Sequence, residues 1–143
     1  MSVICREALV PYSAKSMFDL VNDVACYPDF LPWCAATHIH YQSNEEMKAS
    51  ITVSKGGIQK SFTTHNRLVT DTSIELELLD GPFSAFHGRW QFYALAEQGC
   101  KITFELSFEF KKSLISYAFK KIFEPAANAM MQAFVDRAKH IYG

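Results

Sequence analysis

The sequence predicts one domain of the α+β class, in which a strongly curved antiparallel sheet of seven strands wraps around a long C-terminal helix. The 143 residues have the usual size of a single domain, so we assign positions 1–143 to one unit. Apolar and polar residues alternate through the middle of the chain, as they do in strands with one packed face. From Ser113 onward, apolar residues recur at helical spacing instead.

The chain begins with a predicted strand and a predicted helix. Val3 to Leu9 is strand-like, and Pro11 marks its end because proline donates no hydrogen bond to a sheet. Ser13 is a good N-cap for a helix that ends near Asn22 and Asp23. The apolar residues at helical spacing within this helix are Met17, Phe18, Leu20 and Val21.

Six strands are predicted after this helix, and with the first strand they would form a seven-stranded meander. Turn-forming residues separate them at Ser43-Asn44, Gly56-Gly57, Asp71-Thr72, Asp80-Gly81-Pro82 and Gln98-Gly99. The alternation assigns the following residues to the inward face: Met47, Ala49, Ile51 and Val53; Ile74, Leu76 and Leu78; Cys100, Ile102, Phe104, Leu106, Phe108 and Phe110.

A long amphipathic helix is predicted to begin at Lys112 or Ser113. Pro125 lies inside it and is expected to kink it or divide it in two. Its stripe must pack on the inner face of the sheet, and a sheet that grips one helix leaves room for a cavity. The predicted stripe consists of Ile115, Phe119, Ile122, Ala126, Met130, Phe134, Ala138 and Ile141.

Tyr27 to Cys34, with the sequence YPDFLPWC, fits neither a helix interior nor a central strand. Pro28 and Pro32 each remove a hydrogen-bond donor and fix φ, yet the segment is too aromatic for an ordinary solvated loop. Two interpretations stay open. The segment either completes the core as a plug, or gates the cavity mouth with its aromatic side chains.

Short motifs spread over nearly the whole chain resemble those of one known family. They are Val10-Pro11-Tyr12-Ser13; Tyr27-Pro28 with Phe30-Leu31-Pro32 and Cys34; Val53-Ser54-Lys55; Phe62-Thr63-Thr64; Asp80-Gly81-Pro82-Phe83 with Gly88 and Trp90; and Gln132-Ala133-Phe134 with Arg137-Ala138-Lys139. In this order they resemble the START-like coenzyme Q-binding/polyketide cyclase-like family. The resemblance implies a helix-grip (START/Bet v 1-like) fold of β-α-α-β6-α order with an elongated apolar cavity.

The resemblance implies two classes of function. Mitochondrial members imply a non-enzymatic protein that binds ubiquinone or a related isoprenoid lipid and supports respiratory electron transfer. Bacterial members imply the alternative, an inhibitor that binds the large ribosomal subunit and blocks subunit joining. We place the quinone first, as a bound ligand and not as a required cofactor.

A hydrophobic-ligand carrier needs a cavity, aromatic planes and a gate. A quinone ring stacks on aromatic side chains, and its tail gains roughly 0.8 kcal/mol for each buried CH₂. Each residue considered alone is better explained as ordinary core, and the hypothesis gains from the fold and not from any one position. We expect the ligand to contact Tyr27, Phe30, Leu31, Trp33, Phe62, Trp90, Phe92, Phe104, Phe108, Phe119, Met130 and Phe134.

The charge and cysteine content exclude several other functions. The net charge of −1 is not that of a DNA-binding domain. No cysteine pair has CxxC spacing, so neither a zinc site nor a thioredoxin-like motif is indicated. No apolar run approaches the ~20 residues needed to span a bilayer and the N-terminus has no signal-peptide core, so we expect a cytosolic protein that contacts a membrane, if at all, only peripherally. Two interpretations stay open for a set of basic residues: an ordinary solvated face, or a surface for ribosomal RNA or anionic lipid headgroups, which the sequence does not separate. These residues are Lys111, Lys112, Lys120, Lys121, Arg137 and Lys139.

No constellation of residues predicts catalysis or a metal site. His38 and His40 share a strand face but have no third ligand nearby in sequence, so a solvated strand face is the better interpretation. The predicted inward faces carry almost no groups able to do acid, base or nucleophilic work. We therefore expect a protein that is not an enzyme.

Overall fold

The structure, a computed structural model, describes residues 1–96 and 99–143, so the Gln98 part of the last predicted turn lies outside the described residues. Seven strands and two α-helices follow the predicted order, with one 3-10 helix (η1) after the first α-helix. The elements are β1 (Ser2–Val10), α1 (Ala14–Asn22), η1 (Val24–Asp29), β2 (Cys34–Gln42), β3 (Glu46–Lys55), β4 (Ile58–Val69), β5 (Ser73–Asp80), β6 (Phe83–Ala94), β7 (Cys100–Phe110) and α2 (Leu114–Tyr142).

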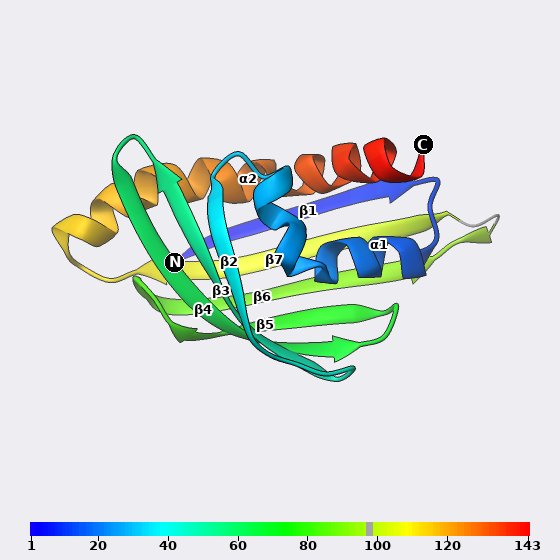
Figure 1. Cartoon of the computed structure of the whole chain (residues 1–143), viewed down its shortest axis with the longest axis horizontal. Coiled ribbons are helices and arrows are strands. Elements are labelled where there is room, and N and C mark those ends of the chain that lie inside the picture. The colour runs from blue at the N-terminus through cyan, green and yellow to red at the C-terminus, as the bar shows by residue number, and fades with distance from the viewer. Residues whose placement is uncertain (97–98) are drawn as a thin grey trace.

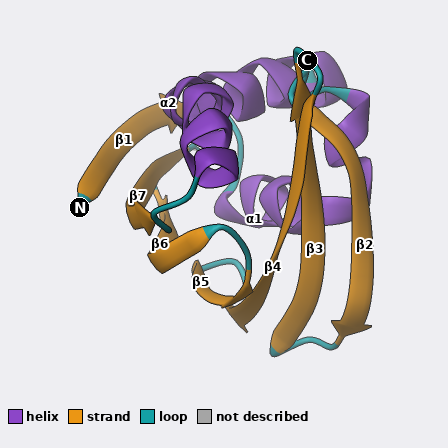
Figure 2. Cartoon of the chain, turned by 90° about the vertical axis from the view of Figure 1, so that its left-hand side faces the viewer, coloured by secondary structure: helices purple, strands orange, loops and turns teal. Residues whose placement is uncertain are grey.

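The strands form one antiparallel sheet in the order β1-β7-β6-β5-β4-β3-β2. Strands β2 to β7 are a meander, but the prediction of a seven-stranded meander is wrong for β1, which pairs with β7 from Ser2↔Phe108 to Val10↔Cys100. The reason is that α1 and η1 carry the chain from β1 to the opposite edge, where β2 starts. Figure 2 shows the sheet curling around both helices, which confirms the predicted architecture.

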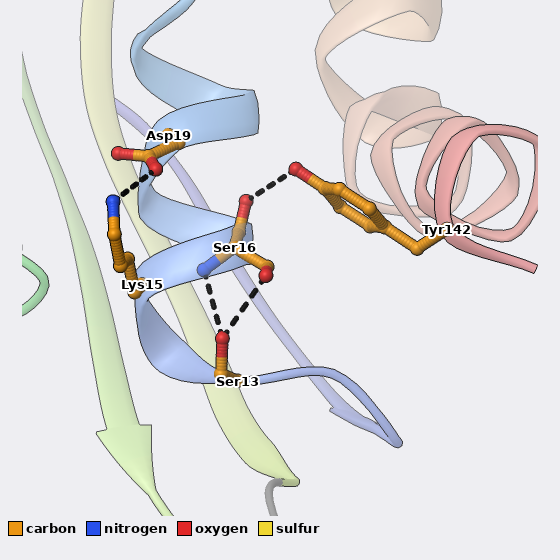
Figure 3. A network of polar contacts seen from close by, with 5 residues as sticks. All are labelled: Ser13, Lys15, Ser16, Asp19 and Tyr142. Atoms are coloured by element: carbon orange, nitrogen blue, oxygen red, sulfur yellow. Dashed lines mark hydrogen bonds and ion pairs between the residues drawn. The ribbon is translucent and has the colours of Figure 1, made fainter.

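The predicted N-cap of α1 is present and is part of a small polar network (Figure 3). The Ser16 amide donates a hydrogen bond to Ser13 Oγ at 3.0 Å, which satisfies one of the free donors of the first turn. The Tyr142 hydroxyl donates to the Ser16 carbonyl oxygen at 2.9 Å, and its ring lies 5.6 Å from that of Tyr12. The last turn of α2 is therefore tied to the first turn of α1.

Helix α2 is capped by Ser113 and continues through Pro125 as one helix, so Pro125 does not divide it. The predicted stripe is confirmed at Phe119, Ala126, Phe134 and Ala138, which are buried. It is wrong at Ile115 and Ile141, which are 59% and 47% exposed near the two ends of the helix. The buried face also includes Phe123, Ala127 and Met131, because a sheet curved around a helix covers more than one narrow stripe.

Candidate functional site

A cavity lies between the inner face of the sheet and α2, with η1 covering one side. The space open to the centre of a water molecule is about 60 Å³. The side chains around it are mainly aromatic and aliphatic, and they come from β3 to β7, α1, η1 and α2. In this conformation the cavity admits water or a very small molecule, so a larger ligand requires part of its wall to move.

Six of the twelve predicted ligand contacts line this cavity. Trp90 and Phe104 stack with ring centroids 4.3 Å apart, because adjacent strands β6 and β7 place them opposite each other. These two rings offer flat apolar surfaces to the interior. The six predicted contacts that line the cavity are Tyr27, Trp33, Phe62, Trp90, Phe104 and Met130.

The other six predicted contacts lie outside the cavity lining. Phe30 and Phe134 pack edge to face with centroids 5.4 Å apart, and Leu31 is almost fully buried beside the same loop. Phe92 packs edge to face on Phe18 of α1 at 5.8 Å. Phe108 and Phe119 belong to a cluster of phenylalanine rings around Phe83. The structure places these six as core, and a ligand-contact role for them stays a prediction.

Three polar side chains in the cavity wall were missed at the level of sequence. Thr64 Oγ1 donates a hydrogen bond to Asn66 Oδ1 at 2.7 Å, and both residues are 5% exposed. Asn22 Oδ1 is buried, and no described residue donates a hydrogen bond to it. A buried acceptor without a partner costs about 1–3 kcal/mol. Thr64 and Asn66 interrupt the inward alternation from Phe62 to Leu68, and that signal could have revealed them.

The segment Tyr27 to Cys34 combines a buried anchor with a more exposed end. Tyr27 and Leu31 are 8% and 1% exposed, and the Tyr27 hydroxyl donates to the Val21 carbonyl oxygen. Burial raises the pKa of the Tyr27 hydroxyl well above its ordinary value, so it stays a donor. Tyr27 and Leu31 therefore pack as core, as the plug interpretation expects, whereas Pro28 and Asp29 between them are exposed.

Trp33 forms the wall between the cavity and an outer groove. Its side chain is half-buried and lines both spaces, as does Ala126 of α2. Pro32, Lys55 and Pro125 line the groove on the outside. Trp33 and Ala126 therefore lie where the cavity and the groove adjoin.

The six predicted basic surface residues fall into two groups. Lys111, Lys112, Lys120 and Lys121 gather around the start of α2, where Lys120 Nζ lies 3.7 Å from Glu124 Oε1 and Lys121 Nζ lies 5.0 Å from the Tyr117 ring centroid. Lys139 is exposed at the other end of the helix.

Arg137 is not a freely exposed cation. Its guanidinium carbon lies 5.1 Å from the centroid of the Phe30 ring, and its Nε is buried without a hydrogen-bond partner among the described residues. The side chain therefore packs the YPDFLPWC segment against α2.

Groups able to do chemistry are sparse on the described surfaces. Among residues 1–96 and 99–143, no three His, Cys, Asp or Glu side chains gather closely enough to hold a metal ion. The rings of His38 and His40 lie 4.6 Å apart, and His40 Nε2 forms a 2.7 Å hydrogen bond with Ser50 Oγ. These histidines lie on the exposed side of β2, as the solvated-face interpretation expects.

Similar proteins extend over almost the entire chain. Ribosome association toxin RatA of Pseudomonas aeruginosa is 49% identical over 140 residues, which cover 98% of this chain and 97% of that protein. RatA of Escherichia coli K12 is 48% identical over 142 residues, covering 99% and 90%. The mitochondrial coenzyme Q-binding protein COQ10 of Drosophila melanogaster is 28% identical over 142 residues, covering 96% of this chain and 59% of that protein.

Solved structures support the fold. The ZhuI aromatase/cyclase of Streptomyces sp. R1128 superposes with a TM-score of 0.84 at 14% identity, covering 99% of this chain and 96% of that one. A START superfamily protein of Mycobacterium smegmatis gives a TM-score of 0.79 at 19% identity, covering 97% and 98%. The family model described as polyketide cyclase/dehydrase and lipid transport matches residues 10–135. The chain therefore belongs to this START-like polyketide cyclase/dehydrase and lipid transport family.

Proposed function

We propose that this chain associates with the ribosome and that it acts by binding instead of by catalysing a reaction. The observation that carries the proposal is the 48–49% identity with RatA from two bacteria along almost the whole chain. The COQ10 relative is only 28% identical. The comparisons thus favour the ribosomal role, which the sequence-based interpretation placed second, over the quinone role that it placed first.

In its more specific form, the proposal is that the chain binds the large subunit and blocks subunit joining. With a net charge of −1, binding to RNA phosphates has to come from local groups of basic side chains. Such contacts release counterions, so the association weakens steeply as salt concentration rises. Partial pairing, as between Lys120 and Glu124, reduces the number of phosphates that such a group can neutralise.

Sedimentation through sucrose gradients tests this proposal. We expect the chain to co-sediment with isolated large subunits at about 50 mM salt, to dissociate at several-fold higher salt, and to lower the yield of joined subunits. Isolated small subunits are the control, and they should not carry the chain. Absence from the large-subunit fractions at low salt would contradict ribosome association, whereas binding with normal subunit joining would contradict only the block.

A second function is favoured by the polar groups inside the cavity. The Thr64–Asn66 pair and the Asn22 oxygen face an otherwise apolar, aromatic-lined interior. Asn22 Oδ1 has no donor among the described residues, and a buried acceptor without a partner is retained at a cost. We propose that the cavity takes an apolar small molecule with a hydrogen-bonding group, with ubiquinone or a related isoprenoid as the leading ligand, once Trp33 moves.

Extraction of the purified protein, followed by mass spectrometry of the bound lipid, tests the cavity directly. We expect a quinone or another isoprenoid in the extract, and its amount should fall about five- to tenfold in Thr64→Val, which removes one hydrogen-bonding group. Thr52→Val is the matched control, because Thr52 Oγ1 bonds to Ser61 Oγ on the exposed side of the sheet. A wild-type extract free of isoprenoid lipid would sink the ligand assignment and leave ribosome association untouched.

A further inference from the structure

The first turn of α2 exposes an unusual amount of apolar surface. Leu114 is 90% exposed, Ile115 is 59% exposed and Tyr117 is 61% exposed. Ser113 caps the helix here, so these residues belong to a formed helix and not to a loose terminus. Figure 1 shows this end of α2 reaching beyond the sheet, away from both α1 and the C-terminus. We call Leu114, Ile115 and Tyr117 the apolar tip.

Lysine side chains surround the apolar tip. Lys111 and Lys112 precede it, and Lys120 and Lys121 follow one turn later. Lys60 of β4 lines the same shallow groove as Lys111 and Ile115, which adds a fifth lysine from a distant part of the sequence. The acidic residues lining the grooves at this end are Asp80, Glu109 and Glu124, so the basic charges outnumber them.

The combination of exposed apolar side chains with a ring of lysines distinguishes between two partners. RNA phosphates would attract the lysines, but an RNA backbone would leave Leu114 and Ile115 in contact with water. A bilayer that contains anionic lipids accepts both kinds of group, because its headgroups attract lysines while its acyl boundary takes up apolar side chains. The lysines have stems long enough to reach the headgroups while the tip lies deeper.

We propose that the start of α2 docks on an anionic lipid bilayer, with the apolar tip inserted at the boundary between headgroups and acyl chains. In the described part of the chain, no helix has the length and apolar content needed to cross a membrane, so the contact is peripheral. The tip lies on the same helix as Ala126, which forms part of the cavity wall. This docking does not rest on ribosome association, although both would use lysines around the start of α2.

Flotation with lipid vesicles tests the proposal on the full chain. We expect binding to vesicles of 70% phosphatidylcholine and 30% phosphatidylglycerol at about 50 mM salt, and about tenfold weaker binding to vesicles of phosphatidylcholine alone. Leu114→Glu should weaken binding to the anionic vesicles about tenfold. An acidic residue in the first turn is favourable for a helix, so this variant should fold normally.

The matched control is Leu9→Glu. Leu9 is 74% exposed and is the penultimate residue of β1. The C-terminal end of β1 lies on the opposite side of the molecule from the start of α2 (Figure 1). This variant adds the same charge and removes a similar apolar area, so it should bind vesicles like the wild type. A double variant that combines Lys111→Glu and Lys112→Glu should weaken binding to the anionic vesicles and reduce the dependence of that binding on salt.

Two results would overturn the proposal. In the first, Leu114→Glu and Leu9→Glu bind anionic vesicles equally, or neither the wild type nor the variants bind at all. In the second, Leu114→Glu and the lysine variants lose large subunits in sucrose gradients while vesicle binding is unchanged, which would assign this surface to RNA. Selective loss of vesicle binding by the tip variants supports membrane docking.

Discussion

The position of Trp33 between the cavity and the outer groove makes a quantitative prediction. Truncation by Trp33→Ala removes a half-buried ring, so we expect it to lower the free energy of unfolding by about 2 kcal/mol, roughly half the cost of a fully buried aromatic residue. Because the same ring forms the wall beside Ala126, its removal should also open the cavity to the groove. Uptake of the fluorescent apolar probe N-phenyl-1-naphthylamine should accelerate at least tenfold.

Two further variants distinguish a residue that closes the cavity from one that only fills the core. Leu31 is 1% exposed and lies outside the cavity lining, so Leu31→Ala should cost about 2–5 kcal/mol without faster uptake of the probe. Phe30→Ala should also lower stability without changing the uptake of the probe, because Phe30 packs on Tyr27, Phe134 and Arg137. Urea denaturation measures the stability, and stopped-flow fluorescence measures the uptake. Unchanged uptake in Trp33→Ala would refute the assignment of Trp33 as the wall.

Three other predictions concern stability. Tyr142→Phe should cost about 0.5–1.5 kcal/mol and increase hydrogen exchange at the start of α1, since it removes the hydrogen bond between the two helices; equal exchange would contradict this. Gly81→Ala should cost about 1–3 kcal/mol, more than Gly56→Ala, because Gly81 has φ +153° and an added Cβ would lie 2.7 Å from Phe62 Cβ. Burial raises the pKa of the Cys34 thiol from 9.0 to about 11. The contribution of the neutral thiol to the free energy of unfolding should be complete below pH 9 and be lost between pH 9 and 11. Urea denaturation of the wild type should show this decline, and Cys34→Ala should not show it.

The strands could be predicted from the sequence because a half-buried strand imposes period two on its residues. The inward series from Met47 to Val53 and from Cys100 to Phe108 is buried as expected, apart from the half-buried Ile51. The pairing of β1 with β7 could not be predicted in this way. Alternation records which face of a strand is buried, but it contains nothing about which strand lies beside it.

The site was predicted less completely than the fold, and the reason is the same at each position. An inward aromatic residue has one pattern in sequence whether it touches a void or another ring, so Trp90 and Phe108 were indistinguishable, although only Trp90 lines the cavity. Thr64 and Asn66 did carry a signal, because polar residues in an inward phase need partners. A polar residue at an inward position is a more informative signal than an inward aromatic residue, since it marks a specific requirement for a hydrogen-bond partner.

Fold alone does not decide among the functions of this family. The aromatase/cyclase with a TM-score of 0.84 shares only 14% identity with this chain, so the common architecture says little about the residues of either site. The function of this chain therefore has to be argued from particular side chains. The polar groups at Asn22, Thr64 and Asn66 determine what the interior can hold, whereas the apolar tip and its lysines determine what the exterior can touch. Because these two sets of residues do not overlap, variants in one should leave the other function unchanged, and their effects on stability should be nearly additive.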